Sequence, residues 1–160
     1  MTNAPGIELT TETDEETKNL GASLAPALEI GDIISLTGDL GAGKTQFVQG
    51  LAAGLEIKKP VTSPTFVIIK QYNDGHLPLY HFDVYRLDSS RNLHALGYEE
   101  YFFGDGVTVI EWGDKIKDIL PPDHLEVEFH RSTESANRRT LVITSFGQRS
   151  EQLKKELERE

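Results

Sequence analysis

Hydrophobic residues recur with a helical period near the start of the chain, directly behind a run of carboxylates. Carboxylates are favoured in the first turn of a helix, so residues 11–28 are expected to form an amphipathic helix that begins at Thr11 or Thr13. Gly21 interrupts the helical pattern, because glycine disfavours a helix interior. The apolar face of the predicted helix consists of Leu20, Leu24 and Leu28.

A short apolar run at residues 33–37 comes next and predicts a buried strand. A glycine-rich segment follows this run, and from Lys44 onward the apolar residues return at helical spacing. Together these patterns predict the order strand, glycine loop, helix over residues 33–55. The apolar positions of the helix are Phe47, Val48, Leu51, Ala52 and Leu55.

The second half of the chain alternates strand and helix signals. β-Branched and aromatic residues flank a turn at 73–75 and predict an antiparallel hairpin over residues 65–87. The later signals predict a helix from Ser89 or Ser90 to near Gly97, strands at 107–110, 125–130 and 140–146, and a brief helix at 114–120. Residues 151–160 predict a charged helix that faces solvent.

The composition narrows the possible functions. A chain of 160 residues with 38% apolar residues fits one globular domain, and the absence of cysteine excludes disulfides and thiolate zinc sites. No apolar run approaches the roughly 20 residues of a spanning helix, and the acidic start is unlike a signal peptide, so a soluble cytoplasmic protein is expected. The net charge of −10 disfavours direct binding to nucleic acid but permits a phosphate ligand in a local pocket.

The glycine loop matches the phosphate-binding pattern GxxxxGK[ST] at every fixed position. Its glycines allow main-chain N–H groups to surround a phosphate, and the positive end of the following helix adds to the attraction. In this pattern the lysine reaches the β- and γ-phosphates and the final hydroxyl binds Mg²⁺. The alternative is a glycine turn before an ordinary helix, but the strand and helix on either side favour nucleotide binding. The eight residues are Gly38, Asp39, Leu40, Gly41, Ala42, Gly43, Lys44 and Thr45.

Two carboxylates are candidates for orienting Mg²⁺ or an attacking water. Glu111 ends the apolar run at 107–110, and Asp83 lies in a strand pattern that places His81, Asp83 and Tyr85 on one face. Each carboxylate also has a structural alternative. Glu111 could cap a helix, and Asp83 could form an ion pair with Arg86. His81 by itself is more typical of a structural histidine than of a catalytic base.

Two further features admit both a functional and a structural interpretation. Ser63, Pro64 and Thr65 follow the phosphate-loop helix, where nucleotide switches place a hydroxyl that senses the γ-phosphate, although serine and proline are also common in turns. Trp112, the single tryptophan, can lie against a nucleotide or a partner, or in the core. The five histidines show no zinc-binding spacing.

Four sequence blocks together resemble the bacterial TsaE family, formerly called YjeE. They are GDLGAGKT at 38–45, TSPTF at 62–66, HFDVYRL at 81–87 and VIEW at 109–112. Their order and spacing agree over residues 10–147. The resemblance implies an α/β fold of the P-loop NTPase type with three layers, whose central, mostly parallel sheet is flanked by antiparallel strands. It implies a single P-loop ATPase domain over residues 1–147, followed by a charged helical tail over 148–160.

The resemblance also implies a function and a set of site residues. Members of the family are ATPases that act with the TsaB and TsaD proteins in making the threonylcarbamoyladenosine modification of tRNA. By this resemblance ATP and Mg²⁺ are the cofactors, Lys44 and Thr45 hold phosphate and metal, and Asp83 and Glu111 serve metal and water. The remaining members of the expected nucleotide site are Gln46, Thr65 and Trp112.

Two other function classes use the same loop. A small-molecule phosphotransferase needs an acceptor pocket and usually an arginine-bearing lid, and residues 87–107 hold no arginine-rich insertion. A nucleotide-dependent switch similar to a regulatory GTPase is the other alternative. The guanine-reading sequence NKxD does not occur in the chain, which favours ATP over GTP.

Overall fold

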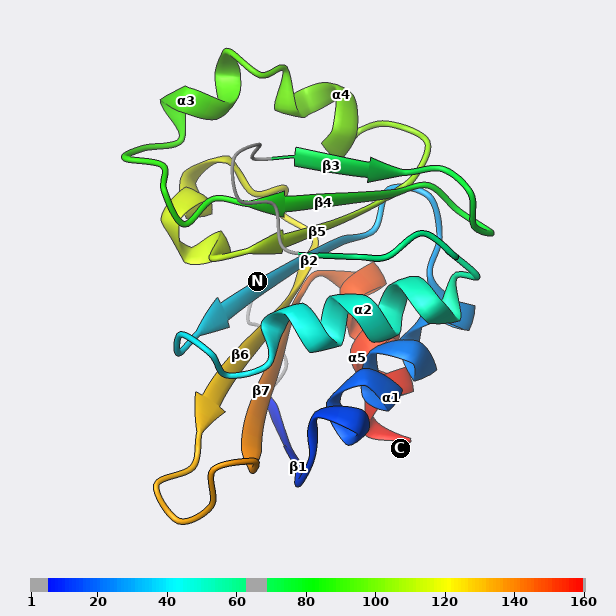
Figure 1. Cartoon of the computed structure of the whole chain (residues 1–160). Coiled ribbons are helices and arrows are strands. Elements are labelled where there is room, and N and C mark those ends of the chain that lie inside the picture. The colour runs from blue at the N-terminus through cyan, green and yellow to red at the C-terminus, as the bar shows by residue number, and fades with distance from the viewer. Residues whose placement is uncertain (1–5, 63–68, 160) are drawn as a thin grey trace.

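The computed structural model describes residues 6–62 and 69–159, and this part of the chain contains a seven-stranded sheet (Figure 1). Its strand order is β1-β7-β6-β2-β5-β4-β3. The four central strands β6, β2, β5 and β4 are parallel, whereas β3 at one edge and β7 and β1 at the other pair antiparallel. The strands are β1 Ile7–Thr11, β2 Ile33–Gly38, β3 Ile69–Tyr72, β4 Leu79–Asp83, β5 Val107–Glu111, β6 His124–Arg131 and β7 Arg139–Phe146.

Helices cover the sheet on both faces and make three layers. The larger core cluster lies between one face of the sheet and helices α1, α2 and α5, which Figure 1 shows gathered on the same side. The smaller cluster lies on the other face, beneath α3, α4 and η2. The helices are α1 Asp14–Leu24, η1 Ala25–Ala27, α2 Lys44–Gly54, α3 Arg91–His94, α4 Tyr98–Phe102, η2 Gly113–Ile119 and α5 Gln148–Glu158. The predicted α/β fold, with its mostly parallel centre and antiparallel flanks, is confirmed.

The N-terminal region differs from the prediction of one helix over residues 11–28. The chain first forms strand β1 on the edge of the sheet, and α1 begins only after Thr13, whose side chain accepts a hydrogen bond from the Glu16 N–H. Gly21 does not break the helix. A Cβ atom at this position would lie 2.3 Å from the carbonyl oxygen of Phe47, so glycine is required where α1 crosses α2.

Two expectations for later helices were also inexact. The predicted helix after residues 89–90 is the single turn α3, and a second short helix, α4, follows it. The C-terminal helix was expected to face solvent, which is wrong. Leu153 and Leu157 of α5 are buried in the larger core cluster, because the apolar side of this otherwise charged helix packs on the sheet. Among the described residues, no helix is long and apolar enough to cross a membrane.

Candidate active site

The glycine loop joins the end of a central strand to the start of a helix, as predicted. β2 ends at Gly38, and the next residue is fixed to β6 by a hydrogen bond of 2.9 Å from the Asp39 N–H to the carbonyl oxygen of Phe129. Gly41 and Gly43 have φ values of 71° and 101°, which residues with a Cβ atom rarely adopt. The loop therefore turns sharply, and α2 begins at Lys44 directly above the end of the parallel strands.

A cavity of about 320 Å³ lies at this end of the sheet. It brings together most of the residues that the sequence predicts for the site, and it adds Tyr85. The lining residues are Leu40, Gly41, Ala42, Gly43, Lys44, Thr45, Gln46, Asp83, Tyr85, Glu111 and Trp112. Gly38 and Asp39 lie at the base of the loop and do not line the cavity. Residues Ser63 to Thr65 of the predicted switch lie outside the described residues.

Lys44 is buried, with 5% of its surface exposed, and its amine donates hydrogen bonds back into the loop. The acceptors are the carbonyl oxygens of Gly38 at 3.2 Å and Asp39 at 2.6 Å. The amine also lies 4.1 Å from the centre of the Trp112 ring, within cation–π distance. Burial lowers the pKa of Lys44 below its ordinary value, although the carboxylate of Glu111 acts in the opposite direction.

Glu111 is a buried carboxylate held between two side chains. The Thr45 hydroxyl donates to its oxygens at 3.2 and 3.3 Å, and Nε2 of His81 lies 2.6 Å from Oε2. Glu111 is 3% exposed and His81 is fully buried, so the contact between these two side chains is shielded from water. The parallel register of β4 and β5 places Asp83 directly beside Glu111. The two predicted carboxylates therefore meet at one edge of the sheet, beside the first hydroxyl of α2.

Aromatic rings border the cavity on the side of β4 and β5. The rings of Tyr85 and Trp112 lie 4.9 Å apart, and Trp112 takes a left-handed φ of 66° where β5 passes into η2. The Tyr85 N–H donates to the Asp83 carboxylate at 3.0 Å, which fixes the chain just after β4. Sequence reasoning did not include Tyr85 in the site, although its alternation with Asp83 was the signal for it.

The oxygen donors at this edge suit magnesium. The described part of the chain holds no group of three or more histidine, cysteine, aspartate or glutamate side chains arranged for a metal ion. Mg²⁺ in nucleotide sites needs no such group, because it keeps several waters and binds one or two protein oxygens together with substrate phosphates. The hydroxyl of Thr45 and the carboxylates of Glu111 and Asp83 fit that requirement.

The parallel strands, the glycine loop and the helix that follows it define a protein of the P-loop fold. A family model described as "Threonylcarbamoyl adenosine biosynthesis protein TsaE" matches residues 11–141. The chain belongs to the TsaE family, and the resemblance inferred from the four sequence blocks is thereby confirmed.

Individual relatives agree along nearly the whole chain. The tRNA threonylcarbamoyladenosine biosynthesis protein TsaE of Bacillus subtilis strain 168 is 46% identical over 149 residues, which cover 93% of this chain and 92% of that protein. The protein of the same name from Nostoc sp. strain PCC 7120 is 47% identical over 136 residues, covering 82% of each chain. The crystal structure of Bacillus subtilis YdiB is similar with a TM-score of 0.84 and 41% identity, and the match covers 99% of this chain and 97% of that one.

Proposed function

We propose that this protein binds and hydrolyses ATP as a cytoplasmic subunit required for the threonylcarbamoyladenosine modification of tRNA, acting on a complex of TsaB and TsaD. One observation supports the ATPase activity above all others. Thr45, the last residue of the phosphate loop, donates to the buried carboxylate of Glu111 beside the cavity. A loop that binds phosphate and a carboxylate at the end of the adjacent strand are the parts that P-loop hydrolases share.

Most residues that line the cavity have a role in this proposal. The main-chain N–H groups of residues 41–44 surround the phosphates, and Lys44 leaves its carbonyl acceptors to pair with the β- and γ-phosphates. Bound Mg²⁺, held by Thr45 with Glu111 and Asp83 close by, would neutralise charge on the phosphates. Trp112 and Tyr85 border the nucleotide from the side of β5.

Glu111 also orients the attacking water, and its own position is fixed by His81. A carboxylate buried against a histidine and a hydroxyl has few alternative orientations, so the water it binds is held close to one position. Phosphoryl transfer depends mainly on positioning and charge stabilisation. Loss of Glu111 is therefore expected to reduce turnover more than binding.

The tRNA-modification role rests on the names of relatives that match nearly the whole chain. TsaB and TsaD as partners follow from the family resemblance alone. The net charge of −10 supports a division of labour, because a strongly acidic subunit is poorly suited to bind the phosphate backbone of tRNA itself.

The test is phosphate release from ATP by the purified protein, alone and with TsaB and TsaD. We expect weak turnover alone and a clear rise when both partners are present. Turnover that does not depend on the partners would contradict the proposed role in the complex. Transfer of the phosphate to a metabolite, with no free phosphate released, would instead identify a phosphotransferase.

A further inference from the structure

Arg139 lies behind the phosphate loop and has no role in the proposed ATPase site. It begins β7, opposite Arg131 of β6 and Thr11 of β1. Its side chain is 8% exposed, and its Cγ lies 3.9 Å from the position that a Cβ atom would occupy at Gly43. The hairpin formed by β6 and β7 thus buries a charged side chain against the loop.

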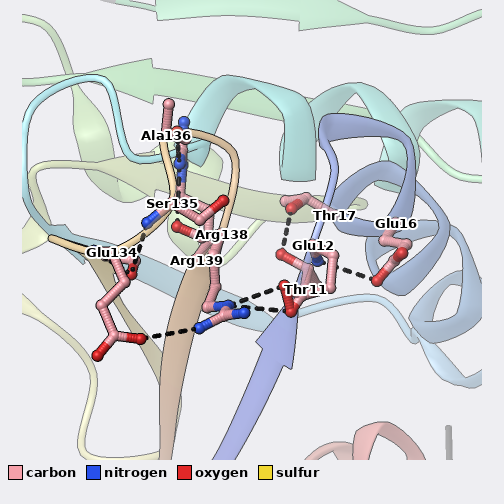
Figure 2. A network of polar contacts seen from close by, with 10 residues as sticks. Thr11, Glu12, Glu16, Thr17, Glu134, Ser135, Ala136, Arg138 and Arg139 are labelled. Carbon is pink, nitrogen blue, oxygen red and sulfur yellow. Dashed lines mark hydrogen bonds and ion pairs between the residues drawn. The ribbon is translucent and has the colours of Figure 1, made fainter.

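The guanidinium of Arg139 connects the hairpin turn to the loop. Nη1 donates to the carbonyl oxygens of Ala136 at 2.6 Å and Arg138 at 3.0 Å, and Nη2 donates to the carbonyl oxygen of Gly41 at 3.4 Å. Figure 2 shows Arg139 beside Ala136 and Arg138 in this turn. Nε is buried without a hydrogen-bond partner. Within residues 6–62 and 69–159, the guanidinium therefore meets only neutral carbonyl acceptors and forms no ion pair with a carboxylate.

The contact with Gly41 determines how one peptide group of the loop is oriented. A peptide group is planar, so the carbonyl of Gly41 and the N–H of Ala42 point in opposite directions. The carbonyl turns toward Arg139, and the N–H turns back across the loop, where it donates to the carbonyl oxygen of Asp39 at 3.3 Å. If this peptide flipped, a carbonyl would take the place of an N–H on the inner side and would repel a phosphate.

The buried charge of Arg139 also favours binding of an anion in the cavity. A buried guanidinium without an anionic partner is costly, and any anion that approaches it is correspondingly favoured. Gly41, whose carbonyl accepts from Arg139, and the nearby Gly43 both line the cavity. A triphosphate bound there would bring negative charge to the opposite side of the loop from the guanidinium.

We propose that Arg139 is a positioning residue for nucleotide binding, which holds the Gly41–Ala42 peptide with its N–H turned into the loop. The inference deepens the proposed function and rests on ATP binding in this cavity. By this inference, the β6–β7 hairpin directly influences the affinity for ATP, although it carries none of the fixed residues of the phosphate-binding pattern.

The experiment measures MgATP binding by calorimetry, together with KM and kcat for phosphate release, for the full chain and three variants. Arg139→Gln removes the charge, and Arg139→Lys keeps the charge but loses the planar fork that reaches three carbonyls. The matched control is Arg138→Ala, because the neighbouring Arg138 is exposed and pairs with Glu12 and Glu134 at the surface (Figure 2).

We expect Arg139→Gln to bind MgATP about tenfold more weakly and Arg139→Lys to fall between it and the wild type, with Arg138→Ala within about twofold of the wild type. KM should rise more than kcat falls, because a displaced loop weakens binding, whereas general loss of folded protein lowers the apparent kcat and leaves KM unchanged. Thermal unfolding of each variant without nucleotide measures its folding separately.

Three results would overturn the inference. They are wild-type affinity in Arg139→Gln, an equal loss in Arg138→Ala, and failure of both Arg139 variants to fold while Arg138→Ala folds, since Arg139 would then be a folding residue. A wild-type protein that does not bind MgATP at all would instead contradict the proposed function.

Discussion

Two cavities lie at opposite ends of β2, and both combine a helix N-terminus, a basic side chain and carboxylates. The cavity of about 320 Å³ beyond Gly38 contains the start of α2, Lys44 and Glu111. A cavity of about 180 Å³ before Ile33 contains the start of α5, Arg149 and a set of carboxylates. The two cavities therefore share their chemical components and differ in how these are paired.

In the smaller cavity the charges are paired within the protein. The carboxylate of Asp123 accepts hydrogen bonds of 2.9 Å from the N–H groups of both Arg149 and Ser150, at the start of α5. The guanidinium of Arg149 donates to both oxygens of the buried Asp32, at 2.9 and 2.8 Å. This end of the sheet anchors α5 and leaves little for a ligand to bind.

In the larger cavity the corresponding groups have weaker partners. Helix α2 begins at Lys44, its N-cap residue Gly43 provides no side chain to cap the N–H groups, and the Lys44 amine donates to neutral carbonyls. In the proposed function, a triphosphate would supply an anionic hydrogen-bond partner for these donors. In a cavity of this composition, charged groups without ionic partners are available to bind a ligand. Charged groups that pair with one another instead hold neighbouring elements of the fold together. Substitutions at the two ends of β2 separate these two roles.

The largest expected effect is loss of nucleotide binding in Lys44→Ala. Removing the buried amine should weaken MgATP binding about 1,000-fold, because a charge-assisted phosphate contact is lost in a site screened from water. The measurement is calorimetric titration. Lys155→Ala is the control, since Lys155 is exposed on α5 and does not line the cavity, and the variant should bind MgATP within about twofold of the wild type. Equal losses in both variants would show that only the general positive charge matters.

The next effect separates turnover from binding. Glu111→Ala should lower kcat about 100-fold while MgATP affinity changes only a few-fold, because water and metal lose their orientation. Asp83→Ala should behave similarly with a smaller loss, since Asp83 lies at the half-buried end of β4. Phosphate release and calorimetry measure the two quantities. Wild-type turnover in both variants would refute the roles assigned to these carboxylates.

At the opposite end of β2, a substitution should affect stability and leave nucleotide binding intact. Arg149→Ala leaves the buried carboxylate of Asp32 without its charged partner and should lower the free energy of unfolding by about 2 kcal/mol, discounted because Arg149 is partly exposed. Denaturant unfolding measures this change. Arg159→Ala removes an exposed ion pair with Glu156 and should have almost no effect. Weakened MgATP binding in folded Arg149→Ala would contradict the separation of the two ends.

The smallest effect is a pH dependence at the start of α5. Burial opposes ionisation of Asp123, but the hydrogen bonds from Arg149 and Ser150 outweigh it and lower its pKa. A lowered pKa in the folded state contributes stability above the unfolded pKa of about 3.9. That contribution is lost as the pH falls through the folded pKa.

Unfolding free energies of wild type and Asp123→Asn, measured between neutral pH and pH 2 to 3, test this prediction. The difference between the two proteins should be constant near neutral pH and should shrink in acid. A difference that grows as the pH falls would reverse the sign assigned to the Asp123 pKa.

The sequence predicted the parts of the molecule that depend on local patterns. The phosphate loop and the β3–β4 hairpin follow from residue spacing and strand alternation, and the structure contains both. Asp83 and Glu111 were each identified as candidates, but their position side by side depends on the pairing of β4 with β5. Strand β1 was missed because its five residues form a strand only by pairing with β7, more than 120 positions further along the chain.

Other features depend on contacts that spacing cannot reveal. Helix α5 has only a few apolar residues among charged ones, and burial of Leu153 and Leu157 depends on the anchor at Asp123 and Arg149. Arg139 belongs to no motif, and the strand pairing that carries it beneath Gly41 is visible only in the folded chain. His81 was interpreted as a structural histidine, and its contact with Glu111 required the register of β4 and β5.

The most direct test of the account is a crystal structure of the protein with Mg²⁺ and a non-hydrolysable ATP analogue. We expect the triphosphate within the loop of residues 38–45, Lys44 on its β- and γ-phosphates, and Mg²⁺ bound to the Thr45 hydroxyl beside Glu111. A triphosphate bound elsewhere on the molecule, or a loop that holds no nucleotide at saturating concentration, would contradict it.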